Sequence, residues 1–187
     1  MAFLKNAVIV IAITGLLVGL TYWNQLEVTE PQPQASVPEH LAQWDAERYQ
    51  SLRDNAGFAV TEGRWSDVVQ FCNEMLEWRE DDETVWFWLG CGHLIQGDYE
   101  QSERVWNYML RFPRNRQETL YNLTCSLAML GKSEEALGVF EQLLAEGFSD
   151  FEQADEDEHF FPLRGDPRFE RMLDELSTRV PFEFGNR

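Results

Sequence analysis

The feature that most constrains the fold is a glycine that recurs at intervals of 34 residues. Gly63, Gly97 and Gly131 each follow a stretch whose apolar residues return every three or four positions, and each precedes another such stretch. That spacing is typical of a helix with one buried face, and glycine is the residue that most often ends a helix. Self-similarity at a fixed period indicates stacked structural units. The sequence therefore predicts an all-α fold built from repeated helical hairpins.

We divide this region into three units, 49–82, 83–116 and 117–150, within a domain that spans residues 38–150. The units resemble tetratricopeptide repeats, a helix-turn-helix family of the same period. In the clearest unit, 83–116, the residues that carry the resemblance are Trp86, Leu89, Gly90, Gly97, Tyr99, Ser102, Trp106 and Met109. The third unit offers Leu120, Leu123, Thr124, Gly131, Ser133, Ala136, Phe140 and Leu143. The first unit matches only in its second half, at Gly63, Trp65, Val68, Cys72 and Met75.

The resemblance implies a three-repeat solenoid of helical hairpins. In such packing, small residues such as Gly90 and Ser102 let the paired helices approach, and large ones such as Trp86 and Trp106 fill the space between pairs. The segment 151–178 looks like an acidic turn followed by a capping helix, because a terminal repeat must hide its apolar face. We expect the inner stripe of this cap to consist of Phe169, Met172, Leu173 and Leu176. Residues 179–187 form a tail.

Residues 7–23 carry no charge and are almost entirely apolar, which predicts one transmembrane helix. No small-residue cleavage site or lipid-bearing cysteine follows the segment, so we favour an uncleaved anchor over a signal peptide or a lipoprotein. Lys5 precedes the segment and acidic residues follow it, which places residues 1–6 in the cytoplasm. Residues 24–37 form a proline-rich linker. Gly15 and Gly19 make a GxxxG pattern that could support a weak homodimer.

The charge balance argues against nucleic acid as a partner. The chain has 33 Asp and Glu against 15 Lys and Arg, and a formal charge of −18. Binding to nucleic acid depends on basic side chains that neutralise phosphates. We attribute the acidity to solubility or to a salt-adapted host rather than to an acidic docking face. Three cysteines, Cys72, Cys91 and Cys125, lie inside the repeats without CxxC spacing, so we expect free thiols.

No set of residues predicts an enzyme, a cofactor or a metal site. His40, His93 and His159 are far apart in the sequence, and neither an HExxH nor a GxSxG motif is present. We interpret His93 as a packed core residue. The acidic run 155–159 could attract a divalent cation, but it lacks the alternating ligands and central glycine of a calcium loop. A solvated acidic turn is the interpretation that we favour.

In the family that these units resemble, ligands lie along the concave face formed by the first helix of each pair. Mapped onto this chain, that face predicts a protein-binding groove made by Arg53, Thr84, Phe87, Cys91, Leu94, Ile95, Tyr121, Cys125 and Met129. Arg53 is its only cation, which argues against a clamp for a terminal carboxylate. An apolar groove suits a helix or an extended hydrophobic segment. An alternative is that the protein fills the groove itself, with the helix that starts at Pro38 or with residues 180–184.

The resulting prediction is a non-enzymatic scaffold with one span in the inner membrane and its C-terminal domain in the periplasm. We expect it to bind protein partners as an accessory or assembly subunit of a bacterial envelope complex. The alternative from a different class is a periplasmic chaperone or quality-control factor that binds unfolded client chains.

Overall fold

The computed structural model describes residues 39–178, with side chains from residue 45 onward. The predicted membrane span 7–23 with its GxxxG pair, the linker 24–37 and the tail 179–187 lie outside the described residues. The chain divides into two units between Ala42 and Gln43, and the helical hairpins belong to the second of them. No helix among the described residues is long and apolar enough to cross a membrane.

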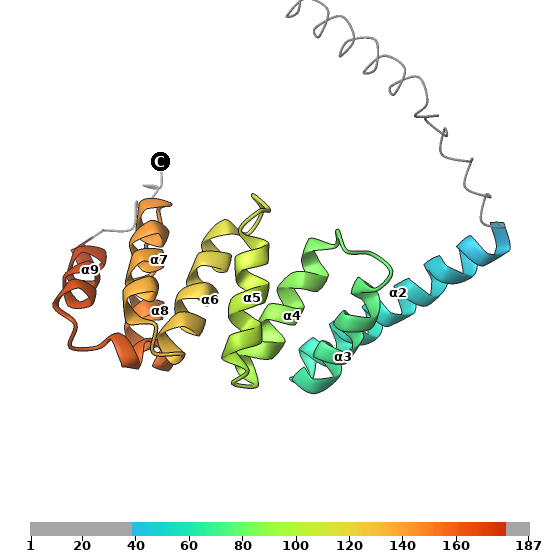
Figure 1. Ribbon diagram of the computed structural model, residues 1–187, viewed down its shortest axis with the longest axis horizontal. Coiled ribbons are helices and arrows are strands. Elements are labelled where there is room, and N and C mark those ends of the chain that lie inside the picture. Colours follow the sequence, from blue (N-terminus) through green and yellow to red (C-terminus); the bar gives the residue numbers. More distant parts are fainter. Residues whose placement is uncertain (1–38, 179–187) are drawn as a thin grey trace, which may run out of the picture. The chain divides into compact units, whose positions relative to one another are not determined.

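All regular structure in the described range is helical (Figure 1). The elements in chain order are α2 (Glu39–Thr61), α3 (Trp65–Leu76), α4 (Glu83–Ile95), α5 (Tyr99–Met109), α6 (Arg116–Met129), α7 (Ser133–Ala145), α8 (Phe151–Glu156), the 3-10 helix η1 (Glu158–Leu163) and α9 (Pro167–Thr178). From α3 to α7 each helix packs against the next one in the chain, and α9 packs against α7 and α8. The prediction of an all-α fold made of helical hairpins is confirmed.

The repeated glycines end helices by adopting a left-handed backbone conformation. Their φ angles are 68° at Gly63, 76° at Gly97 and 71° at Gly131. At the α4–α5 turn, the amide of Gly97 donates to the Leu94 carbonyl at 3.1 Å, and the amide of Asp98 donates to the His93 carbonyl at 2.9 Å. These bonds satisfy carbonyl groups that the end of a helix leaves free. The 34-residue period is therefore the period of the hairpin turns.

The glycine period continues one step further than the predicted repeats. Gly165 lies 34 residues after Gly131, has a φ of 84° and closely precedes α9. The predicted capping helix therefore occupies the place of a second helix in a fourth unit. The first helix of that unit is α8, which is short. It ends before Asp157, whose backbone is extended with a ψ of 116°. The chain then continues as η1.

Close approach of α4 and α5 depends on Gly90. A Cβ atom added to this residue would lie 2.6 Å from the Trp106 ring, which is far inside van der Waals contact. The Trp106 indole is completely buried and donates to the Ser102 hydroxyl at 2.9 Å. That hydroxyl lies 2.8 Å from the Ser126 hydroxyl of α6. The predicted role of small residues between paired helices is confirmed at these positions.

The last helix closes the core with aromatic packing. Phe169 of α9 is completely buried, with its ring centroid 5.2 Å from that of Phe140 and 5.8 Å from that of Phe160. Leu173 and Leu176 are buried as well, whereas Met172 is only half-buried. The predicted inner stripe is thus confirmed for three of its four residues. All three cysteines are free thiols, as expected.

Candidate functional site

The first helix of the second hairpin, α4, presents an accessible stripe. Thr84, Phe87, Cys91 and Ile95 follow one another at steps of three or four residues, which places them on one face of the helix. Thr84, Phe87 and Cys91 are half-buried, and Ile95 is 53% exposed. Leu94, which the sequence places on the same face, is buried at 7% exposure and packs in the core. Four of the five predicted residues on α4 are therefore open to a partner.

The equivalent face of α6 is covered by the chain itself. Tyr121 and Cys125 are buried, with 7% and 1% of their surface exposed. The Tyr121 hydroxyl donates to Asp157 Oδ2 at 2.6 Å, and its oxygen also lies 3.2 Å from the Gln153 carbonyl oxygen. Its ring packs against that of Phe160, with 5.1 Å between the centroids. The covering segment is 153–163, which is neither of the two segments proposed from the sequence.

Met129, the last predicted residue on α6, remains accessible at the edge of this cover. It is half-buried and lines a depression of about 410 Å³ together with Tyr99, Glu158, His159, Phe161 and Pro162. Phe161 is 61% exposed. Met129 and Ile95 occupy equivalent positions in neighbouring hairpins, because 34 residues separate them.

Arg53 fastens α2 to the start of α4 instead of facing a free groove. Its guanidinium forms an ion pair with Asp82 and lies over the Trp88 ring, 5.7 Å from the centroid. Asp82 also accepts hydrogen bonds from the Tyr49 hydroxyl at 2.8 Å and from the Thr84 amide at 3.0 Å. The only cation of the predicted groove is thus already neutralised by a carboxylate of the same chain.

Asp82 is held in its charged form. Burial acts in the opposite direction and favours the neutral carboxyl, but the hydrogen bond from Tyr49, the amides of Val85 and Thr84 and the charge of Arg53 outweigh it. The pKa of Asp82 therefore lies below its usual value. The same side chain caps the N-terminus of α4, where the helix dipole also favours a negative charge.

A second depression, of about 330 Å³, lies beside the open stripe of α4. The rings of Phe87, Tyr121 and Phe148 line it, and Glu118 and Asp150 add two carboxylates. The Phe87 ring is fixed by an edge-on contact with Trp106, with 5.4 Å between the centroids. A depression lined by aromatic rings, with carboxylates beside them, can bind an apolar side chain from a segment that also carries a basic residue.

Phe148 is a lining residue that the sequence-based mapping missed. It follows Gly147, whose φ is 91°, and its amide donates to the Leu143 carbonyl at 3.3 Å. A glycine followed by a large apolar residue just beyond a helix is typical of a chain that folds back onto that helix. This signal was available in the sequence at the end of the third unit.

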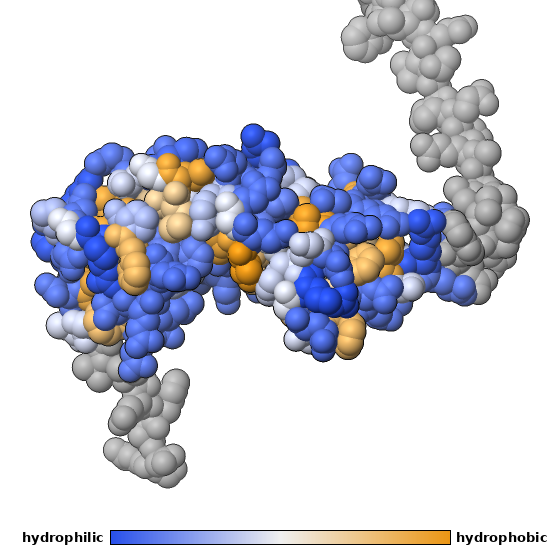
Figure 2. Space-filling view, turned by 90° about the horizontal axis from the view of Figure 1, so that it is seen from below, coloured by the Kyte–Doolittle hydropathy of each residue, from blue (hydrophilic) through white to orange (hydrophobic). Residues whose placement is uncertain are grey.

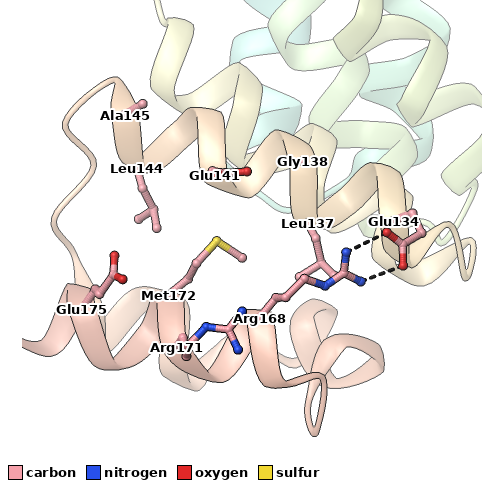
Figure 3. Close-up of a pocket in the computed structure, with 10 residues that line it drawn as sticks. All are labelled: Glu134, Leu137, Gly138, Glu141, Leu144, Ala145, Arg168, Arg171, Met172 and Glu175. Atoms are coloured by element: carbon pink, nitrogen blue, oxygen red, sulfur yellow. Dashed lines mark hydrogen bonds and ion pairs between the residues drawn. The ribbon is translucent and has the colours of Figure 1, made fainter.

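Two other depressions lie away from the predicted face and contain none of its residues. Figure 3 shows the one between α7 and α9, of about 470 Å³, into which Leu144 and Met172 point. Arg168 spans its edge with a bidentate pair to Glu134, with N–O distances of 2.6 and 2.7 Å. The other, of about 720 Å³, includes Trp86, His93 and Tyr108. His93 is half-buried there and its Nδ1 lies 3.2 Å from Asp98 Oδ2, so it is a packed residue with a polar partner.

The surface around these depressions is mainly hydrophilic. Figure 2 shows hydrophobic residues in separate patches on one face, surrounded by polar and charged ones. Small apolar patches in an acidic surface favour contacts that combine an apolar anchor with charge, rather than the burial of one continuous apolar face.

One group in the described part of the chain combines the donor types of a metal site. The ligand atoms of Cys125, Asp157 and His159 all lie within 4.8 Å of one another. From the sequence, the acidic run 155–159 is interpreted as a solvated turn. In the structure Asp157 and His159 are partly buried against α6, while Asp155, Glu156 and Glu158 are exposed. The run is therefore solvated only in part.

Comparison with models of known protein families gives no match. Comparison with curated proteins gives no significant match either.

Proposed function

We propose that the chain is a membrane-anchored helical-repeat scaffold of the tetratricopeptide type, which binds a segment of another protein on the open face of α4. The observation that carries the proposal is the accessible stripe of Phe87, Cys91 and Ile95 next to the aromatic depression with its carboxylates. Nothing within the described residues covers this stripe as segment 153–163 covers α6. An accessible apolar stripe beside a concave pocket is a common form of peptide-binding site.

The proposed partner segment carries one large apolar side chain and at least one basic residue. The depression accommodates the apolar group between Phe87, Tyr121 and Phe148, and the carboxylates of Glu118 and Asp150 lie beside it. Although the sequence alone favours solubility as the reason for the acidity, the net charge of −18 also fits this preference, since a negative surface accelerates association with basic segments.

The proposed anchor and linker, residues 7–23 and 24–37, would hold the binding face close to a membrane surface. Tethering raises the effective concentration toward membrane neighbours to about the mM range without any new contact. With residues 1–6 in the cytoplasm, the helical domain acts in the periplasm, as an accessory or assembly subunit of an envelope complex.

The test is site-specific photocrosslinking in native membranes with the full chain. A photoreactive residue at Ile95 is expected to recover one partner in stoichiometric amount. The same residue at Phe58, which is 60% exposed on α2, is the matched control and is expected to recover none of it. Crosslinking of many unfolded chains to Ile95 would favour the chaperone alternative over the scaffold. Equal recovery of the partner from Ile95 and Phe58 would contradict the proposed binding face.

Charge reversal tests the chemistry of the partner. Glu118→Lys is expected to weaken co-purification of the crosslinked partner in mild detergent by at least about tenfold, because it places a positive charge beside the depression. Asp174→Lys makes the same charge change at an exposed position on α9 and is expected to leave co-purification unchanged. If both variants weaken co-purification equally, the interaction depends on net charge and not on this site.

A further inference from the structure

The geometry points to a binding site for one divalent transition-metal ion of the Zn²⁺ class, formed by Cys125 of α6 and by Asp157 and His159 at the start of η1. The proposal does not depend on the proposed scaffold function, since it rests on the contact between α6 and the segment that covers it. The thiol lies more than 30 residues before the other two donors in the chain, and only the fold brings them together.

The separation of the thiol and the carboxylate matches that expected around a tetrahedral ion, whereas the imidazole lies closer to the carboxylate. In such a site Zn–S bonds of about 2.3 Å and Zn–N or Zn–O bonds of about 2.0 Å place neighbouring donors roughly 3.3–3.7 Å apart. Cys125 Sγ lies 3.7 Å from Asp157 Oδ2, and His159 Nδ1 lies 2.7 Å from Asp157 Oδ1. The histidine and aspartate are closer because a hydrogen bond joins them. An ion that replaces this bond requires the two atoms to separate by roughly half an ångström.

The types of donor select the ion. A thiolate is a soft ligand and an imidazole is a borderline one, and together they favour Zn²⁺ and its neighbours over Mg²⁺ and Ca²⁺, which bind oxygen ligands. Cys125 is 1% exposed, and the side chains of Asp157 and His159 are 19% and 25% exposed. Three protein ligands leave a fourth position for water or another donor.

The carboxylate is already oriented by its neighbours. Asp157 accepts the Tyr121 hydroxyl on Oδ2 at 2.6 Å and the backbone amide of His159 on Oδ1 at 2.9 Å. Hydrogen bonds of this kind hold metal-binding carboxylates in place and affect the affinity for the ion. Tyr121 is therefore a positioning residue for the proposed site, not a ligand.

One of the three donors, His159, lies at a surface depression, and the local charge favours the entry of a cation. His159 lines the depression of about 410 Å³ that also contains Tyr99 and Met129. Acidic residues precede and follow Asp157 in the exposed run. The Cys125 thiol is protonated without metal, because burial raises its pKa well above the usual value. On binding, the thiol proton passes to solvent and the positive ion compensates the thiolate charge.

The chain contains matched controls for each donor. Cys91 occupies the position equivalent to Cys125 in the preceding hairpin, and it does not belong to any cluster of three or more donors among the described residues. His93 and Asp98 form a histidine–aspartate pair at 3.2 Å without a thiol. These residues make it possible to separate the proposed site from general effects of removing a cysteine or a histidine.

The test is a metal titration of the full chain in mild detergent after removal of metals with a chelator. Co²⁺ is the probe, because a cobalt–thiolate bond gives a charge-transfer absorption in the near ultraviolet. We expect one equivalent of Co²⁺ to saturate this absorption and one equivalent of Zn²⁺ to abolish it. Cys125→Ser and His159→Asn are expected to lose the absorption, whereas Cys91→Ser and His93→Asn retain it. Tyr121→Phe is expected to weaken binding by about 10- to 100-fold.

Far-ultraviolet circular dichroism of each variant separates loss of the site from loss of the fold. Because the His159 side chain is partly exposed, His159→Asn is expected to keep the helical spectrum even if Cys125→Ser does not. The absence of saturable Co²⁺ and Zn²⁺ binding by the wild-type chain would overturn the proposal. Retention of the thiolate absorption in a folded Cys125→Ser variant would overturn it as well.

Discussion

The Tyr121 hydroxyl of α6 donates a 2.6 Å hydrogen bond to the carboxylate of Asp157, at the point where the chain leaves α8 and enters η1. This contact closes the face of the third hairpin that would otherwise continue the open stripe of α4. Asp157 also accepts from the backbone and the ring of His159. Although burial alone would raise the pKa of Asp157, these hydrogen bonds lower it to about 2, so the carboxylate is charged at neutral pH.

Tyr121→Phe removes this donor and is expected to lower the free energy of unfolding by about 1.5–3 kcal/mol, because a partly buried carboxylate loses a hydrogen bond. The measurement is chemical denaturation with a chelator present, which keeps the result independent of metal. Tyr108→Phe is the control, since among the described residues its hydroxyl has one exposed contact, of 3.5 Å, with the Glu80 carbonyl. Equal losses of unfolding free energy in the two variants would show that the Tyr121–Asp157 hydrogen bond contributes no more to stability than an exposed tyrosine hydroxyl does.

Gly90→Ala is expected to destabilise the fold by about 1–3 kcal/mol, because the new methyl group would lie 2.6 Å from the buried Trp106 ring. Gly138→Ala is the matched control in α7, where an added Cβ meets no atom within 4 Å. That variant is expected to be neutral or to gain up to about 1 kcal/mol, because alanine favours helix over glycine. Thermal unfolding of both variants tests the prediction, which fails if Gly90→Ala is the more stable of the two.

Phe169→Ala is expected to cost about 3–5 kcal/mol, because it empties a space between Phe140 and Phe160 in the closed core. Phe161→Ala removes a phenylalanine that is 61% exposed on η1 and is expected to change stability by less than about 0.5 kcal/mol. Denaturant midpoints of the two variants give the comparison. A similar small change for both would mean that α9 does not close the core.

Asp82→Asn is expected to reduce stability in a pH-dependent way. The folded pKa of Asp82 lies below its unfolded value, so its contribution is fully present above about pH 4 and is lost as the pH falls through the folded pKa. At pH 7 we expect a deficit of about 1–3 kcal/mol against the wild type, and the deficit should shrink as the pH decreases below about 4.

Denaturation of both proteins at several pH values measures this difference. Asp174→Asn, at an exposed position on α9, is the control and is expected to show little deficit at any pH. A deficit for Asp82→Asn that stays constant from pH 7 to about pH 2 would contradict the assigned role of the carboxylate charge.

Much of the fold was available from the sequence because its determinants are local. Gly63, Gly97 and Gly131 end helices through their own backbone conformation, and the small residue Gly90 admits the ring of Trp106 from the adjacent helix. The continuation of the glycine period to Gly165 was present in the sequence as well. The predicted span at 7–23 lies outside the described residues and stays a prediction.

The accessibility of the predicted face could be read from the sequence for most of α4, but on α6 only for Met129. Spacing determines which side of a helix a residue lies on, and it correctly groups Phe87, Cys91 and Ile95. Spacing does not determine what packs against that side. Leu94 is buried in the core and Arg53 is paired with Asp82, because residues from other parts of the fold pack against them.

By itself, the sequence determined the helices, their turns and the small residues between them, since each depends on residues within one or two hairpins. Only the tertiary structure decided that α8 breaks at Asp157 and that the following segment turns onto α6. That path buries Tyr121 and Cys125, leaves the stripe of α4 open, and brings the carboxylate of Asp157 and the ring of His159 next to the Cys125 thiol. The physical reason is that burial and juxtaposition depend on where distant segments lie, whereas helix formation depends on near neighbours in the chain.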